Sequence, residues 1–139
     1  MKKYNKGFTL TELMVATAIV AILAAIAYPS YMGSVRKSNR TEAKTELTDV
    51  AQRLQKCFTT YGRFDDPNGE NLCPVFERLT TGPVYKTRGR GLYEITITNT
   101  AATTYTLTAT AVAAPQLADT GCEALTLDHM GQALPQECW

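Results

Sequence analysis

The chain has 139 residues, which is enough for one domain, and its 14 basic and 13 acidic residues leave a formal net charge of +1. Such a balance does not by itself indicate a polyanionic partner. The sequence also has no Ser/His/Asp order, no paired-carboxylate pattern, no phosphate-binding loop and no metal-binding box. We therefore expect no enzyme activity, no cofactor and no metal site.

The most distinctive stretch is the apolar segment of residues 7–31, GFTLTELMVATAIVAILAAIAYPSY. It is long enough to span a bilayer, which takes roughly 20 helical residues, yet it contains Glu12. Because a lone carboxylate at membrane depth is costly, we expect Glu12 to have a partner. Lys2, Lys3 and Lys6 precede the segment, but no small-residue cleavage site follows it, so we expect it to be retained.

Residues 7–13, GFTLTEL, resemble the cleavage and methylation motif of type IV pilins. The resemblance implies that a prepilin peptidase cuts after Gly7, which removes a leader of residues 1–7, and then methylates Phe8. It also implies that Glu12 pairs with the N-terminal ammonium of a neighbouring subunit and sets the register of assembly.

A single long helix is expected from Phe8 to about Thr60, roughly 80 Å at 1.5 Å per residue. Its first part, residues 8–31, is apolar on every face, as in a membrane or filament-core helix, and we expect it to extend beyond the head. Pro29 removes a backbone hydrogen bond, so a kink or weak point is expected there. The resemblance implies that this weakness serves assembly.

The second part of the helix, residues 32–60, is amphipathic. The charged side chains between its apolar residues, among them Glu42 and Glu46, are expected to face solvent or neighbouring subunits, because like charges one turn apart are tolerable only when exposed. Gly62 is expected to end the helix. The apolar stripe expected to pack under the head consists of Ala43, Leu47, Val50, Leu54, Cys57 or Phe58, and Tyr61.

The globular head, residues 61–139, is predicted to contain a three- or four-stranded antiparallel sheet, which makes the fold class α+β. Proline and glycine punctuate residues 63–91, so a long loop is expected first. Alternating apolar residues then predict a hairpin with Tyr93, Ile95 and Ile97 inward on its first strand. The inward set of its second strand is Tyr105, Leu107, Ala109 and Ala111. The strands are expected at 92–98, 104–111, 123–128 and 132–134.

The four cysteines allow three pairings. We expect disulfides, because small exported domains with thin cores use them as staples. Of the three pairings we expect the sequential one, Cys57 with Cys73 and Cys122 with Cys138. Each would close a loop of about 17 residues, worth about 3 kcal/mol in chain entropy. The alternative is a zinc site, but the sequence has no C-x-x-C pair and only His129 to add.

The order of long helix, loop, strands and disulfide-bounded C-terminal region resembles the pilin fold, and the ending from Cys122 to Trp139 resembles minor pilins of the PilE type. The resemblance implies a structural subunit, a minor pilin, of a type IV pilus that supports adhesion, twitching motility or DNA uptake. Implied partners are other pilin subunits, the prepilin peptidase and inner-membrane assembly machinery. The subunit would wait in the inner membrane with its head in the periplasm, then join the cell-surface pilus.

Other functions are left open. A major pilin is one, and a type II secretion pseudopilin is another, although family pseudopilins generally lack a disulfide loop such as Cys122–Cys138. A plain membrane-anchored binding domain, not cut at Gly7, is a third.

DNA binding is a further hypothesis, since exposed cations interleaved with aromatic side chains hold phosphate backbones and some minor pilins are DNA receptors. Its residues are Lys86, Arg88 and Arg90, with Arg78 before them and Tyr85 and Tyr93 beside them. The simpler interpretation is a solvated loop, or one that pairs with acidic neighbours in the filament.

Overall fold

The computed structural model describes residues 7–139 and divides the chain into two compact units. The first unit ends at Ser34, and the second, which we call the C-terminal unit, is Val35–Trp139. The basic leader residues Lys2, Lys3 and Lys6 lie outside the described residues.

Helix α1 runs from Leu10 to Tyr61, 52 residues, and includes Pro29 without a break in the helix. The predicted single helix and its end at Gly62 are therefore confirmed. Gly62 has a φ of +74°, a backbone conformation that residues with a Cβ rarely adopt. Its N–H donates to the Phe58 carbonyl at 2.8 Å. The weak point at Pro29 stays a prediction.

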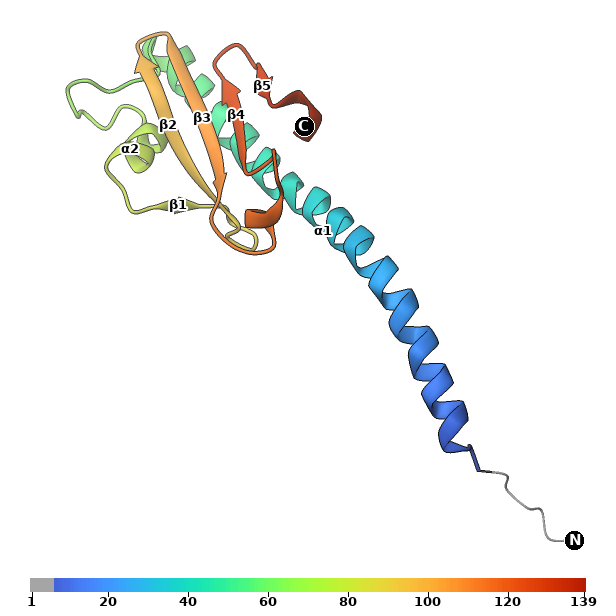
Figure 1. Cartoon of the computed structure of the whole chain (residues 1–139). Helices are drawn as coiled ribbons and strands as arrows, with labels where there is room; N and C mark the ends of the chain where they lie inside the picture. Colours follow the sequence, from blue (N-terminus) through green and yellow to red (C-terminus); the bar gives the residue numbers. More distant parts are fainter. Residues whose placement is uncertain (1–6) are drawn as a thin grey trace, which may run out of the picture. The chain divides into compact units, whose positions relative to one another are not determined.

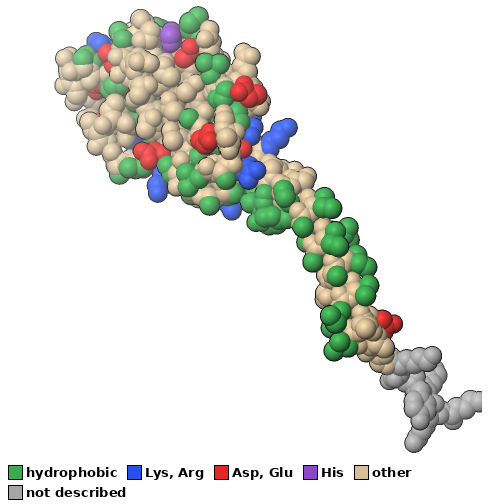
Figure 2. All heavy atoms as spheres, viewed as in Figure 1, with side chains coloured by type: hydrophobic (Ala, Val, Ile, Leu, Met, Phe, Trp, Pro, Cys, Tyr) green, Lys and Arg blue, Asp and Glu red, His purple; other side chains and the backbone are tan. Residues whose placement is uncertain are grey.

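In the first unit all residues from 7 to 31 are exposed in the single chain. Within the described residues, α1 is the one helix long and apolar enough to cross a membrane, with a mean hydropathy of 2.3 over its most apolar window. Figure 2 shows hydrophobic side chains along this segment and most of the charged side chains on the C-terminal unit. An apolar surface of this extent needs lipid or neighbouring helices to cover it.

The C-terminal unit contains a five-stranded antiparallel sheet in the order β1-β2-β3-β4-β5, beside the part of α1 that belongs to this unit (Figure 1). The α+β fold class is confirmed, and so is the central hairpin, in which Thr96 lies opposite Thr108 and Ile97 opposite Leu107. The strands are β1 (Tyr85–Lys86), β2 (Tyr93–Ala101), β3 (Thr104–Ala111), β4 (Ala124–Asp128) and β5 (Ala133–Leu134).

The expected long loop of residues 63–91 is wrong in part, because it contains helix α2 (Pro74–Thr80) and strand β1. Proline was taken as a breaker, but Pro74 lies in the first helical turn, where a missing N–H costs nothing. Strand β1 has only two residues, too few to show an alternation. Two short 3-10 helices, Gln116–Ala118 and Gln136–Cys138, complete the unit.

The core lies between α1 and the sheet. The predicted stripe is buried at Ala43, Leu47, Val50 and Leu54, but Tyr61 is 49% exposed, so its assignment to the stripe was wrong. The sheet contributes Tyr93, Ile95, Tyr105, Leu107, Ala109 and Leu125, all fully or almost fully buried. This set includes most of the inward positions predicted for the hairpin, while Ile97 is half-buried at the margin of the core.

Two disulfides join residues that lie outside the strands of the sheet. Cys57 of α1 is joined to Cys73 at the start of α2, and Cys122 before β4 is joined to Cys138, which is the sequential pairing. No cysteine among the described residues is free, so no thiolate is left for the alternative zinc site.

Candidate functional site

Three reciprocal hydrogen bonds between Thr9 and Glu12 cap the N-terminal end of α1. The Glu12 carboxylate accepts from the Thr9 N–H at 2.8 Å and from its hydroxyl at 2.9 Å, while the Glu12 N–H donates to the Thr9 hydroxyl at 3.2 Å. This arrangement is a capping box. The sequence analysis missed it, although the Thr-x-x-Glu spacing of Thr9 and Glu12 was its signal.

The other residues predicted for processing and assembly are not brought together within the chain. Phe8 is 92% exposed, and Gly7 is exposed beside it. Pro29 lies inside α1. Their roles in processing and assembly stay predictions.

The predicted basic residues lie on one edge of the sheet, where α2 and β1 are adjacent (Figure 1). We call residues 86–92, KTRGRGL, the basic loop. Lys86 and Arg90 are exposed, and neither forms an ion pair with a carboxylate of residues 7–139. Arg78 of α2 is also exposed, and its guanidinium lies 4.6 Å from the centre of the Tyr85 ring.

Arg88 is paired with acidic residues of its own chain. Its Nε lies 3.1 Å from a Glu46 carboxylate oxygen, and its Nη2 forms an ion pair with Asp49. Its side chain is nevertheless 60% exposed. Arg88 therefore remains at the surface, with part of its charge already balanced.

Tyr85 and Tyr93, which were expected to flank the cations as aromatic platforms, are buried in the core at 6% and 0% exposure. Neither ring is open to a nucleic-acid base in this structure. The Tyr85 hydroxyl donates to Glu46 at 2.7 Å, and burial together with this hydrogen bond raises the pKa of Tyr85. The expectation of an aromatic contribution from these two residues was wrong, because both point inward.

Glu42 and Glu46 do not face solvent as expected. Glu46 is 5% exposed and accepts from Tyr85 and Arg88, whereas Glu42 accepts from the hydroxyl of Thr87 and from the N–H groups of Arg90 and Leu92. Burial raises the pKa of Glu42, but these hydrogen bonds outweigh it and leave the pKa below its ordinary value. Two carboxylates one turn apart thus hold the basic loop against α1.

A second polar cluster ties the connection between β3 and β4 to α1. Asp119, which is 5% exposed, accepts from Arg40 at 2.7 and 2.8 Å and lies 3.8 Å from Arg36. The fully buried Gln116 amide donates to the Tyr93 hydroxyl at 2.6 Å. Sequence analysis did not find this cluster, because its members are about 80 residues apart.

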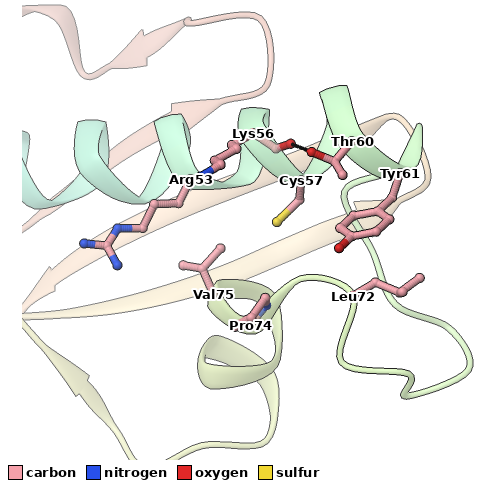
Figure 3. A pocket seen from close by; sticks show the side chains of 8 residues that line it. All are labelled: Arg53, Lys56, Cys57, Thr60, Tyr61, Leu72, Pro74 and Val75. Carbon is pink, nitrogen blue, oxygen red and sulfur yellow. Dashed lines mark hydrogen bonds between the residues drawn. The ribbon is translucent and has the colours of Figure 1, made fainter.

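A hollow lies between the end of α1 and the start of α2 (Figure 3). It has a volume of about 370 Å³ and a mostly apolar wall of Leu72, Pro74 and Val75 opposite Tyr61. Arg53 and Lys56 lie at its edge, and Arg53 is paired with Asp49 at 3.1 Å.

Comparison with known proteins identifies the family. The model described as type IV minor pilin ComP, DNA uptake sequence receptor, matches residues 29–126. The chain belongs to this family of type IV minor pilins. A second model, the prokaryotic N-terminal methylation motif, matches residues 2–28. The resemblance to type IV pilins inferred from the sequence is thereby confirmed.

Several relatives of this type IV pilin have names that identify them as major pilins or fimbrial proteins. The chain is 42% identical over 62 residues to the type IV major pilin protein PilA of Myxococcus xanthus, which covers 45% of this chain and 28% of the relative. It is 36% identical over 66 residues to the type IV major fimbrial protein FimA of Dichelobacter nodosus, covering 48% and 41%. The chain thus spans less than half the length of these relatives.

Proposed function

We propose that this type IV pilin is a minor subunit of a pilus and that its C-terminal unit binds double-stranded DNA. The observation that carries the second part is the basic loop, where Lys86 and Arg90 are exposed and have no carboxylate partner among the described residues. The description of the family as a DNA uptake sequence receptor supports it. We propose no catalytic role.

Double-stranded DNA fits this surface better than single-stranded DNA does. Phosphate contacts require only exposed cations, and Arg78, Lys86, Arg88 and Arg90 meet that need. Single-strand binding also depends on aromatic rings on which bases stack. Because Tyr85 and Tyr93 are buried, the surface near the basic loop lacks the stacking platforms that these residues would have supplied.

Assembly into the pilus would use the first unit. We propose that a prepilin peptidase cuts after Gly7 and methylates Phe8, and that other pilin subunits then cover the apolar side chains. Glu12 would exchange its Thr9 partner for the N-terminal ammonium of a neighbouring subunit. Pro29 would provide the weak point in α1 during this step. Before assembly the segment would hold the subunit in the inner membrane, with the C-terminal unit in the periplasm.

The DNA contact is tested by measuring the affinity of the full chain, in nonionic detergent, for a labelled duplex over a range of salt concentrations. We expect salt-sensitive binding. The double variant Lys86→Ala/Arg90→Ala should bind more weakly, and its slope of log affinity against log salt should fall by about 1.8, which corresponds to two lost phosphate contacts.

The control is Arg63→Ala, which removes one cation, paired with Asp65 at 2.7 Å, at a distance from the basic loop. Phe64, the next residue, donates to Ala102 in the turn between β2 and β3, at the end of β2 away from the basic loop. This variant should bind DNA as the unchanged chain does. The DNA proposal fails if the unchanged chain shows no salt-sensitive binding, or if Arg63→Ala weakens binding as much as the double variant does.

A further inference from the structure

We propose that Glu42 is a positioning residue for DNA contact, in that its carboxylate fixes the basic loop in the shape that presents Arg88 and Arg90 together. The inference rests on the proposed DNA binding and identifies what organises that site. Because Glu42 is negatively charged, it would be expected to repel the phosphates of DNA. We instead assign it a role that supports DNA contact.

The contacts of Glu42 are with the loop backbone rather than with the cationic side chains. Oε2 accepts from the Arg90 N–H at 2.9 Å, and Oε1 accepts from the Leu92 N–H at 3.3 Å and from the Thr87 hydroxyl. Thr87 is itself buried and donates its N–H to the Tyr93 carbonyl at 2.9 Å. Two N–H groups of the loop, two residues apart, therefore converge on one carboxylate that belongs to the protein itself.

The approach of the carboxylate requires a glycine in the loop. A Cβ added to Gly89 would lie 2.7 Å from Oε2 of Glu42 and 2.9 Å from its Cδ, which is too close for either atom to stay in place. Gly91 has a φ of +66°, which again favours glycine. Gly89 is therefore fitted to the Glu42 carboxylate, whereas Gly91 is fitted to the backbone turn between the two N–H donors, Arg90 and Leu92.

Glu46, one turn further along α1, holds the other side of the same loop. Its carboxylate accepts from the Arg88 Nε at 3.1 Å and from the Tyr85 hydroxyl at 2.7 Å. Arg90 is directed toward α1 as well, with its Nη1 3.4 Å from the Asn39 side-chain oxygen. With Glu42 in place, Arg88 and Arg90 belong to one short loop that is held beside α1, and both side chains contact that helix.

Fixing this loop before DNA arrives lowers the entropy cost of binding. Gly89 and Gly91 make the free segment unusually flexible, and a flexible loop must be ordered when its cations meet the phosphates. The N–H groups of Arg90 and Leu92 are already occupied by Glu42, and that of Arg88 donates to Glu46 at 3.4 Å. We therefore expect the phosphate contacts to come from the side chains of Lys86, Arg88 and Arg90.

The test compares two accounts of Glu42, one in which it only repels DNA by its charge and one in which it positions the basic loop, because they predict opposite effects of Glu42→Gln. If Glu42 acts only as a nearby negative charge, Glu42→Gln should strengthen DNA binding, because it removes repulsion. If Glu42 positions the loop, Glu42→Gln should weaken binding about fivefold or more and lower the salt slope. Gly89→Ala should also weaken binding, because its Cβ displaces the carboxylate while all charges are kept. Affinity is measured on the folded full chain in nonionic detergent.

The control is Glu94→Gln, which removes a carboxylate opposite Lys86 that holds no loop N–H. It should bind DNA equally or more tightly. The inference is overturned if Glu42→Gln and Gly89→Ala both bind as tightly as Glu94→Gln. If the unchanged chain binds no DNA, the proposed function has failed and the inference with it. If the unchanged chain binds DNA but the two variants bind as tightly as Glu94→Gln, the inference alone has failed. If Glu42→Gln does not fold, Gly89→Ala decides the outcome.

Discussion

Asp119 is the residue on which the attachment of the β3–β4 connection to α1 depends. Its two carboxylate oxygens meet the Nε and one terminal nitrogen of Arg40, so the pair is bidentate. The side chains of Arg40 and Asp119 are 16% and 6% exposed, which limits screening by water. Removing one partner of such a pair leaves the other charge without compensation.

We therefore expect Asp119→Ala to lower the free energy of unfolding by about 3 kcal/mol, measured by urea unfolding of the oxidised full chain in nonionic detergent. The control is Asp65→Ala, which breaks the more exposed pair with Arg63 and should cost less than about 1 kcal/mol. Equal losses in the two variants would show that burial of the Asp119 pair does not matter.

Glu42 and Glu46 mark the limit of what the sequence could predict at single residues. Their spacing on an amphipathic helix indicated two exposed like charges, and the partners that change this conclusion lie 39 to 50 residues later in the chain. The four buried stripe residues from Ala43 to Leu54 needed no such information, because burial of an apolar residue follows from the helical period alone.

At the scale of elements, the disulfide Cys57–Cys73 joins the end of α1 to α2. We expect Cys57→Ala/Cys73→Ala to lower the free energy of unfolding by about 3 kcal/mol, because the cross-link no longer restricts a loop of about 17 residues in the unfolded chain. Urea unfolding is the measurement. The variant Cys122→Ala/Cys138→Ala opens a loop with the same sequence separation, 16, and is the matched comparison.

Similar losses in both double variants support the loop-closure account of these disulfides. If the Cys57/Cys73 variant unfolds like the unchanged chain, α2 is held by its packing alone, through Val75, Phe76 and Leu79. Hydrogen exchange of the α2 amides distinguishes the two cases, since a helix of seven residues has little stability of its own.

The elements that the sequence predicted well are those with a long regular pattern. The second part of helix α1 and the hairpin of β2 and β3 each repeat an apolar residue at a fixed period over several turns or pairs, and the first part of α1 is a long continuous apolar run. Helix α2 and strand β1 carry too few residues for a period to appear, and tertiary contacts decide them. Strand β1 exists because Tyr85 pairs with Ile95 and its ring reaches the core.

At the scale of the whole molecule, the two units have surfaces suited to different surroundings. The first exposes a continuous apolar helix that carries Glu12 as its charged residue, whereas the C-terminal unit encloses its own core and both disulfides. The N-terminal motif was enough to identify the family from the sequence, because its residues are adjacent in the chain. The DNA-contact hypothesis also came from the sequence, but the structure changes its residues. Tyr85 and Tyr93 are buried and do not contribute stacking surfaces, and Glu42 contacts the basic loop.

The central claim is that this type IV pilin is processed and built into a pilus as a minor subunit. The most direct measurement is the intact mass and N-terminal sequence of the chain from sheared surface filaments and from membranes. We predict a mature chain in the filaments that begins with N-methylated Phe8 and is less abundant there than other pilins. A chain that begins at Met1 and stays in the membrane would contradict the account.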